Sequence, residues 1–185
     1  MPLTKIQSLG ITDGTIVNAD INASAAIAGT KLSGAGKVLQ VVSTFKSDTA
    51  TTSSTSFADV GLSASITPSS ASNKILVLSD AKFGGASGNL WYVQFVRNST
   101  IISNGDASAT RISCNFATDG TGQSIHIFNV GLSFLDSPST TSSTTYKLQF
   151  RSRAGAAVYL NRTGQDRDGE DGRTGSSITL MEIAV

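Results

Sequence analysis

The chain has 185 residues, of which 39% are hydrophobic and 15% charged, and its net charge at pH 7 is +1. This length allows one domain with an appendage, and the balanced charge gives no electrostatic footprint for nucleic acid or an anionic membrane. The single cysteine, Cys114, excludes an intramolecular disulfide, and no stretch approaches the ~20 consecutive apolar residues of a membrane span.

The first 36 residues carry a regular spacing of isoleucine, with small and polar residues between. The positions in question are Ile6, Ile11, Ile16 and Ile21. A step of five matches neither the helix period nor the strand period, so this segment has no continuous face to bury by itself. Burial of these isoleucines around a three-fold axis does not alone offset the entropy of ordering three backbones. We therefore predict an extended attachment and trimerisation arm over residues 1–36, joined at GAGK (34–37) to the next domain.

From residue 38 onward, apolar residues alternate with polar ones and turn residues recur, a pattern typical of β-strands. The run NKILVLSDAKF at 73–83 is more continuously apolar, which is typical of a strand covered on both faces. Ser/Thr-rich stretches at 48–56 and 136–145 are expected to form surface loops. The predicted strands are 37–45, 57–66, 73–83, 89–97, 100–102, 110–117, 124–135, 144–152, 156–161 and 176–185.

Short, regularly spaced strands with polar turns, and no convincing amphipathic helix, are typical of a β-sandwich or jelly roll. We therefore predict an all-β fold, with an antiparallel β-sandwich or jelly-roll knob over residues 37–185 after the N-terminal arm. Cys114 falls in phase with Ile112 and Phe116 on the predicted strand 110–117. This placement favours a buried, inert thiol over a catalytic nucleophile.

The stretch GQDRDGEDGRTG at 164–175 is the part of the chain that most suggests a ligand site. Aspartates and glycines suit a flexible loop of oxygen ligands around Ca²⁺, and the candidate ligands are Asp166, Asp168 and Asp171. However, the bidentate glutamate of an EF-hand is missing from the twelfth position, and arginines interleave with the acids. We therefore expect no bound metal or cofactor, and we take a solvated polar hairpin loop as the default.

Enzyme chemistry finds little support in the residues. A nucleophile–base pair needs a histidine, and the only one, His126, alternates with Ile125 and Ile127, with no Gly-x-Ser-x-Gly elbow in the chain. One cysteine and one histidine cannot complete a zinc site, and the acids that glycoside cleavage requires lie mostly in predicted turns. We predict no catalytic residues and no enzyme activity.

Trp91 and Tyr92 are adjacent on the predicted strand 89–97, so their rings face opposite sides of the sheet. Aromatic residues usually pack in the core, and we expect one of the two there. If the other is exposed, its ring offers a surface for stacking on a sugar.

Several stretches resemble proteins of tailed bacteriophages. DGTIVNADINASAAIAGTKL (13–32), followed by a Ser/Thr-rich β domain, resembles the fibre and fibre-like virion proteins of marine podoviruses and their relatives. The resemblance extends over nearly the whole chain, through SITPSSASNKILVLSD (65–80), LDSPSTTSSTTYKL (135–148), VYLNRT (158–163) and SSITLMEIAV (176–185). It implies a homotrimeric virion component with an N-terminal attachment arm and a distal knob similar to the jelly rolls of the tumour-necrosis-factor and complement C1q kind.

The expected function is therefore that of a short trimeric fibre or knob that attaches a phage to the host surface. Its expected partners are other virion proteins, through residues 1–36, and a host cell-surface glycan, with neither nucleic acid nor membrane insertion. MPLTKIQSLG at the start lacks the apolar core of a signal peptide, so we expect synthesis in the host cytoplasm and residence in the virion. Two alternatives stay open: a capsid decoration or head-fibre protein, and a monomeric carbohydrate-binding module whose arm is a linker.

Overall fold

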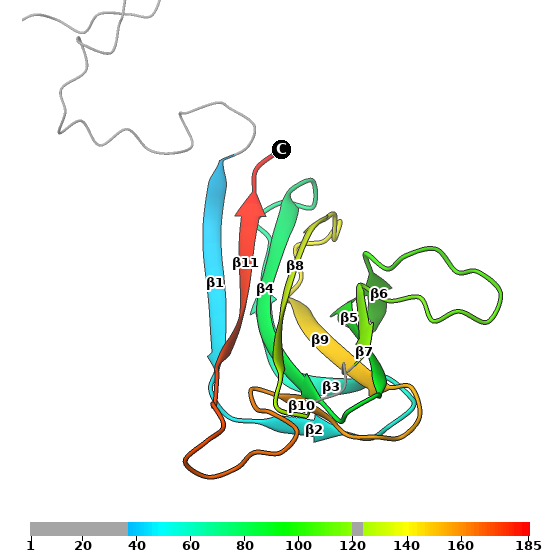
Figure 1. Ribbon diagram of the computed structural model, residues 1–185. Coiled ribbons are helices and arrows are strands. Elements are labelled where there is room, and N and C mark those ends of the chain that lie inside the picture. The colour runs from blue at the N-terminus through cyan, green and yellow to red at the C-terminus, as the bar shows by residue number, and fades with distance from the viewer. Residues whose placement is uncertain (1–36, 120–123) are drawn as a thin grey trace, which may run out of the picture. The chain divides into compact units, whose positions relative to one another are not determined.

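The computed structural model describes residues 37–119 and 124–185. The chain separates into two units, 1–34 and 35–185, and the second forms the structure described below. Its described residues fold into strands and loops without a helix, and the strands form two antiparallel sheets (Figure 1). The prediction of an all-β, antiparallel sandwich is confirmed.

Sheet A is built around one long central strand, β4 (Lys74–Gly85). One edge of β4 pairs with β8 (Ile127–Asp136), and the other pairs first with β11 (Ser176–Ile183) and then with β10 (Val158–Leu160). Outside these lie β1 (Val38–Lys46), next to β11, and β2 (Ala50–Thr52), next to β10. Figure 1 shows β1, β11, β4 and β8 side by side in that order. The long strands β1 and β8 are therefore the two edges of this part of the sheet.

Sheet B has five strands in the order β3-β9-β5, with β6 and β7 sharing the far edge of β5. Its members are β3 (Ala58–Ile66), β5 (Leu90–Arg97), β6 (Thr100–Ile102), β7 (Phe116–Asp119) and β9 (Thr144–Ser152). The alternation in TTYKLQFRS places every second side chain of β9 in the core, as the period of a strand requires.

The core lies between the sheets and consists of the inward-facing side chains of both. Aromatic rings join the two layers: Phe83 on β4 lies 5.4 Å from Trp91 on β5 and 5.9 Å from Phe150 on β9, between ring centroids. Tilted contacts of this kind add to the stabilisation from burial alone. The largest fully buried side chains are Trp91, Tyr146, Phe83, Phe95, Phe150, Leu62, Ile66, Ile75, Leu148, Leu160, Ile178 and Leu180.

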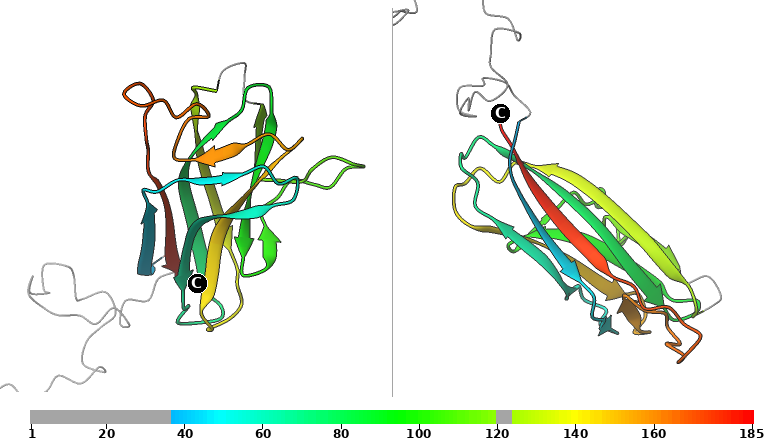
Figure 2. Two further views of the ribbon diagram at one scale, coloured as in Figure 1. Left: turned by 90° about the horizontal axis from the view of Figure 1, so that it is seen from below. Right: turned by 90° about the vertical axis from the view of Figure 1, so that its left-hand side faces the viewer.

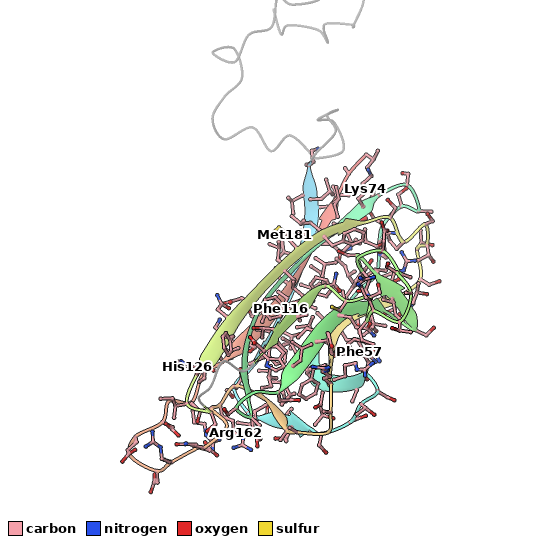
Figure 3. The ribbon with its side chains drawn as sticks, turned by 45° about the vertical axis from the view of Figure 1, so that its right-hand side comes forward. Phe57, Lys74, Phe116, His126, Arg162 and Met181 are labelled. Atoms are coloured by element: carbon pink, nitrogen blue, oxygen red, sulfur yellow. The ribbon has the colours of Figure 1, made fainter. Side chains whose placement is uncertain are left out.

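The first and last described residues lie together at one end of the sandwich, which we call the terminal end. The amide of Ala184 donates a 2.9 Å hydrogen bond to the carbonyl of Lys37. The loop over 161–175, which precedes β11, lies at the opposite end, which we call the loop end (Figure 2). Lys74 and Arg162 mark the two ends in Figure 3. Residue 37 therefore lies at the end of the sandwich opposite the 161–175 loop.

The predicted strand 110–117 is wrong over most of its length, because β7 begins only at Phe116. An asparagine side chain replaces strand pairing here. Asn115 accepts a 2.6 Å hydrogen bond from the Phe95 amide and donates a 2.5 Å hydrogen bond to the Ser103 carbonyl. Short polar side chains compete with backbone ladders in this way. Cys114 therefore lies in a loop and is half-buried. The sequence also gave no sign of β2, which lies inside the predicted loop 48–56.

Candidate assembly face

Apolar side chains form a row across the outer face of sheet A. Val41 on β1 lies opposite Met181 on β11, and Met181 lies opposite Leu76 on β4. Leu76 in turn lies opposite Leu135 on β8. Because side chains alternate between the faces of a strand, these four point away from the core that their neighbours fill. The row thus runs from one edge of the sheet to the other.

Neighbouring rows extend this apolar surface toward the terminal end and the middle of the sheet. Val38 pairs with Ile183, and Leu78 lies one row below Leu76. We call the whole surface the apolar half-face, and its members are Val38, Val41, Leu76, Leu78, Leu135, Met181 and Ile183. Val41 is 55% exposed, Val38 48% and Leu135 47%, whereas the others are half-buried. Full burial of a large aliphatic side chain contributes roughly 1.5–3 kcal/mol relative to exposure, so covering this surface is favourable.

The rest of the outer face of sheet A, toward the loop end, carries more polar side chains. Asp80 forms an ion pair with Lys82, and Asp80 lies between Ser177 and Gly131 in register. The large apolar side chains in this region include Ile127, which is half-buried opposite Gly84, and Phe45. The ring of Phe45 packs on Gly175, where a Cβ atom would be only 2.2 Å from the ring. Contiguous rows of apolar side chains on the outer face therefore lie in the half that adjoins the terminal end.

The outer face of sheet B has the opposite character. A chain of amides crosses three of its strands and reaches the loop beyond β6: Gln149 donates to Asp59 at 2.7 Å, and Gln94 donates to Gln149 at 2.9 Å. Asn104 then donates to Gln94 at 3.3 Å. Lys147 adds an ion pair to Asp59 at 2.8 Å. We call this chain the amide ladder. It makes the outer face of sheet B polar along this line, from the exposed Asp59 to Gln94, which is only 2% exposed. The two sheets therefore differ in what they can pack against.

A buried carboxylate fixes the terminal end beside the apolar half-face. Glu182 is fully buried and accepts hydrogen bonds from Gln40 at 2.5 Å, from Asn73 at 2.6 Å and from the amide and hydroxyl of Ser69 at 2.7 Å. Burial opposes ionisation, but the bonds from these donors outweigh it and lower the pKa of Glu182 to about 2. The carboxylate ties the loop 67–73 to β1 and β11 at the terminal end.

The three aspartates proposed as calcium ligands are not gathered around a common point. Asp166 is held by Arg173 through two bonds of 2.6 Å and by Arg162 at 3.3 Å. Asp171 accepts from the side chain and amide of Arg167 and from Thr163, and the Arg167 bonds lower the pKa of Asp171. Asp168 is exposed. Over 37–119 and 124–185, no group of three or more His, Cys, Asp or Glu side chains is arranged to hold a metal ion.

The residues considered for chemistry or sugar contact lie apart from the apolar half-face. His126 is exposed, with its ring 6.3 Å from that of Phe128. Burial raises the pKa of the Cys114 thiol, which makes it a poorer nucleophile. Trp91 is buried as expected, but Tyr92 is only 8% exposed, and the Arg151 guanidinium lies 5.5 Å above its ring. Neither ring is free to stack on a sugar.

The isoleucines of the predicted arm, Ile6, Ile11, Ile16 and Ile21, lie outside the described residues. Neither a protein-family model nor a curated protein matches this chain. In the part of the chain that the structure describes, no helix is long and apolar enough to cross a membrane.

The sequence pattern missed the apolar half-face as a site, although one signal pointed to it. The continuous apolar run over 73–83 predicted a strand covered on both faces. In the single chain, β4 is fully buried only on its inner face as far as Lys82, and Leu76 and Leu78 remain half-buried on the outer one. The missing cover is the observation on which the functional argument rests.

Proposed function

We propose that this chain is a structural protein of a bacteriophage virion, a short homotrimeric fibre anchored by residues 1–36 that presents its β-sandwich to the host surface. The observation that carries the proposal is the apolar half-face. Soluble monomers rarely leave a contiguous apolar patch of more than a few hundred Å² in water, and large patches of this kind mark association surfaces. The resemblance of 13–32 and 65–80 to phage fibre proteins supports placement in a virion.

The position of the apolar half-face favours assembly between copies of this chain. It adjoins the terminal end, where residue 37 continues from the arm. Copies that bury their half-faces against one another around a three-fold axis bring their three arms to the same end of the assembly. The loop end and the outer face of sheet B then remain outside the interface. This arrangement suits a protein that is anchored at one end and touches a host surface glycan with the other.

The strand order supports the finer proposal of a jelly roll of the tumour-necrosis-factor or C1q kind. Sheet A has the order β1-β11-β4-β8, and sheet B has β3-β9-β5-β7. Most connections cross between the sheets: β3 to β4, β4 to β5, β7 to β8, β8 to β9. A double-sheet barrel of eight principal strands wound in this manner is the pattern of a jelly roll.

The test is the mass of the full-length protein in solution, measured by light scattering on wild type and two variants. In the first variant, Val41→Lys and Leu135→Lys place charges on the apolar half-face at exposed positions. In the matched control, Ile101→Lys makes the same kind of change at a side chain that is 52% exposed on sheet B. We expect a trimer for wild type and for the control, and a monomer for the double variant.

Two outcomes contradict the proposal. A monomeric wild type removes self-trimerisation and favours a capsid decoration protein or a carbohydrate-binding module. A double variant that remains trimeric, with unchanged circular dichroism, removes the half-face as the interface.

A further inference from the structure

The loop that joins β6 to β7, residues 103–115, projects from the edge of sheet B (Figure 1). It contains the sequence Asn104–Gly105. The loop is closed by a hydrogen bond from the Ser113 hydroxyl to the Gly105 carbonyl and by the bond from Asn115 to Ser103. Residues 105–111 are exposed. Asn104 lies at the base of this loop and is the last member of the amide ladder.

We propose that Asn104 is a self-modification site, at which the main-chain nitrogen of Gly105 attacks the side-chain carbonyl carbon of Asn104. The nitrogen gives up its proton and bonds to Cγ, and the Cγ–Nδ2 bond breaks so that Nδ2 leaves as ammonia. Water then opens the resulting cyclic imide at either of its two carbonyls. One opening leaves aspartate at position 104, and the other leaves isoaspartate, whose main chain runs through the former side chain.

The structure holds the attacking group by a single contact. The Gly105 amide makes one long hydrogen bond, to the Cys114 carbonyl at 3.4 Å. A Cβ atom at position 105 would come near that same carbonyl oxygen alone, at 3.9 Å, so the main chain there is uncrowded. Glycine also reaches backbone conformations that other residues avoid, including those that bring its nitrogen to the preceding side chain. The attack therefore needs rotation of the half-buried Asn104 away from Gln94 and Ser113, next to a segment that is exposed from residue 105.

The Asn104 amide is held at one end. Its Nδ2 donates to Gln94 at 3.3 Å and to the Ser113 carbonyl at 3.1 Å, whereas its buried Oδ1 has no hydrogen-bond partner. No donor therefore fixes the carbonyl that turns toward Gly105. Asn98 is an internal comparison, because it is followed by Ser99 and its Oδ1 accepts the Thr145 amide at 2.9 Å. The other described asparagines precede larger residues; they are Asn73, Asn89, Asn115, Asn129 and Asn161.

The modification replaces a hydrogen-bond donor by an acceptor in the contact that holds the loop. A carboxylate replaces the donor Nδ2, so negative oxygens face two acceptors, Oε1 of Gln94 and the Ser113 carbonyl. Gln94 is only 2% exposed, and like polar groups that meet in a buried place are unfavourable. The converted side chain therefore leaves the amide ladder, and the 103–115 loop loosens from sheet B.

The experiment incubates the full-length protein at mildly alkaline and mildly acidic pH and follows its tryptic peptides by mass spectrometry. Cleavage after Arg97 and Arg111 releases residues 98–111, which contain both Asn98 and Asn104. We expect a mass gain of about 1 Da at Asn104, with isoaspartate present, faster at alkaline pH and absent at Asn98. Gly105→Ala, for which the fold has room, should abolish the gain. Hydrogen exchange across 103–115 should rise in the converted fraction.

Two results overturn the inference. If Asn104 stays unconverted while a synthetic peptide of residues 98–111 converts in the same buffer, the fold protects the site. The second result is that Asn104 converts but hydrogen exchange over 103–115 does not change, and the variant Asn104→Asp does not change it either. The loop then does not depend on the bonds from Asn104 to Gln94 and Ser113.

Discussion

The phenolic hydroxyl of Tyr146 donates a 2.6 Å hydrogen bond to Asp136, and this bond joins the two sheets at the terminal end. Tyr146 lies on β9 of sheet B, and Asp136 ends β8 of sheet A. Arg97 on β5 donates to both oxygens of the same carboxylate, at 2.8 and 2.9 Å. Burial and the neighbouring carboxylate raise the pKa of Tyr146, so it remains a donor at every working pH.

Removing this hydroxyl should weaken the sandwich. Tyr146→Phe leaves a nearly buried carboxylate with one donor fewer, and loss of such a partner costs roughly 1–3 kcal/mol. The measurement is the free energy of unfolding in urea. Tyr159→Phe is the control, because Tyr159 is only half-buried and its hydroxyl makes none of the described hydrogen bonds. Equal losses in the two variants would contradict the role given to Asp136.

Glu182 should make the stability of the terminal end depend on pH in the acid range. Its pKa is about 2 in the folded state, below its ordinary value of 4.5, so the unfolded chain takes up the proton first as the pH falls. The stabilisation is therefore complete above pH 4.5 and is lost as the pH falls from 4.5 to about 2.

The variant Glu182→Gln isolates this contribution. At neutral pH it turns an amide NH₂ toward donors and should lower the free energy of unfolding by roughly 1–3 kcal/mol. Below pH 4.5 its stability should fall less steeply than that of wild type. Glu170→Gln serves as the control, since the Glu170 side chain is 61% exposed. Parallel acid profiles for wild type and Glu182→Gln would contradict the prediction.

The loop over 162–173 should be stable without calcium. Arginines already neutralise Asp166 and Asp171 at short distances, so a cation would have to displace them. We expect the same Tm for the full-length protein in excess Ca²⁺ and in a chelator. Asp166→Asn should lower the Tm under both conditions, because it breaks the paired bonds to Arg173. A calcium-dependent rise in Tm that Asp166→Asn abolishes would restore the metal hypothesis.

How far the sequence predicts this fold depends on whether alternation or side-chain chemistry decides each segment. For β3 and β9, apolar residues at every second position match the buried face, whereas β5 is buried on both faces. The predicted bounds of all three strands differ from the observed ones by one residue at most. For 110–115, alternation indicated a strand, but Asn115 supplies the bonds that pairing would supply. The alternation of apolar and polar residues does not reveal that side-chain hydrogen bonds take the place of backbone pairing.

The same limit applies to the candidate sites. Arginines near Asp166 were visible in the sequence, but their pairing requires the bridge between Arg162 and Arg173 that closes the loop. The apolar half-face was equally hidden, because its row draws single residues from β1, β4, β8 and β11. Their registers, which align Val41 with Met181 and Leu76 with Leu135, follow from the whole sheet. Only the continuous run at 73–83 gave a local sign of it.

Deleting residues 1–36 should separate anchoring from folding. The chain separates into units 1–34 and 35–185, and the second contains the core of both sheets, so we expect the shortened chain to keep the circular dichroism and Tm of the full-length β-structure. If the arm is the anchor, the shortened chain should be lost from phage particles when it replaces wild type in an infected host. The measurement is its amount in purified particles. The Ile101→Lys variant, which retains the arm, controls for expression and should be incorporated normally. Full incorporation of the shortened chain would contradict this prediction. The sandwich would then contain the anchor, and residues 1–36 would be a linker.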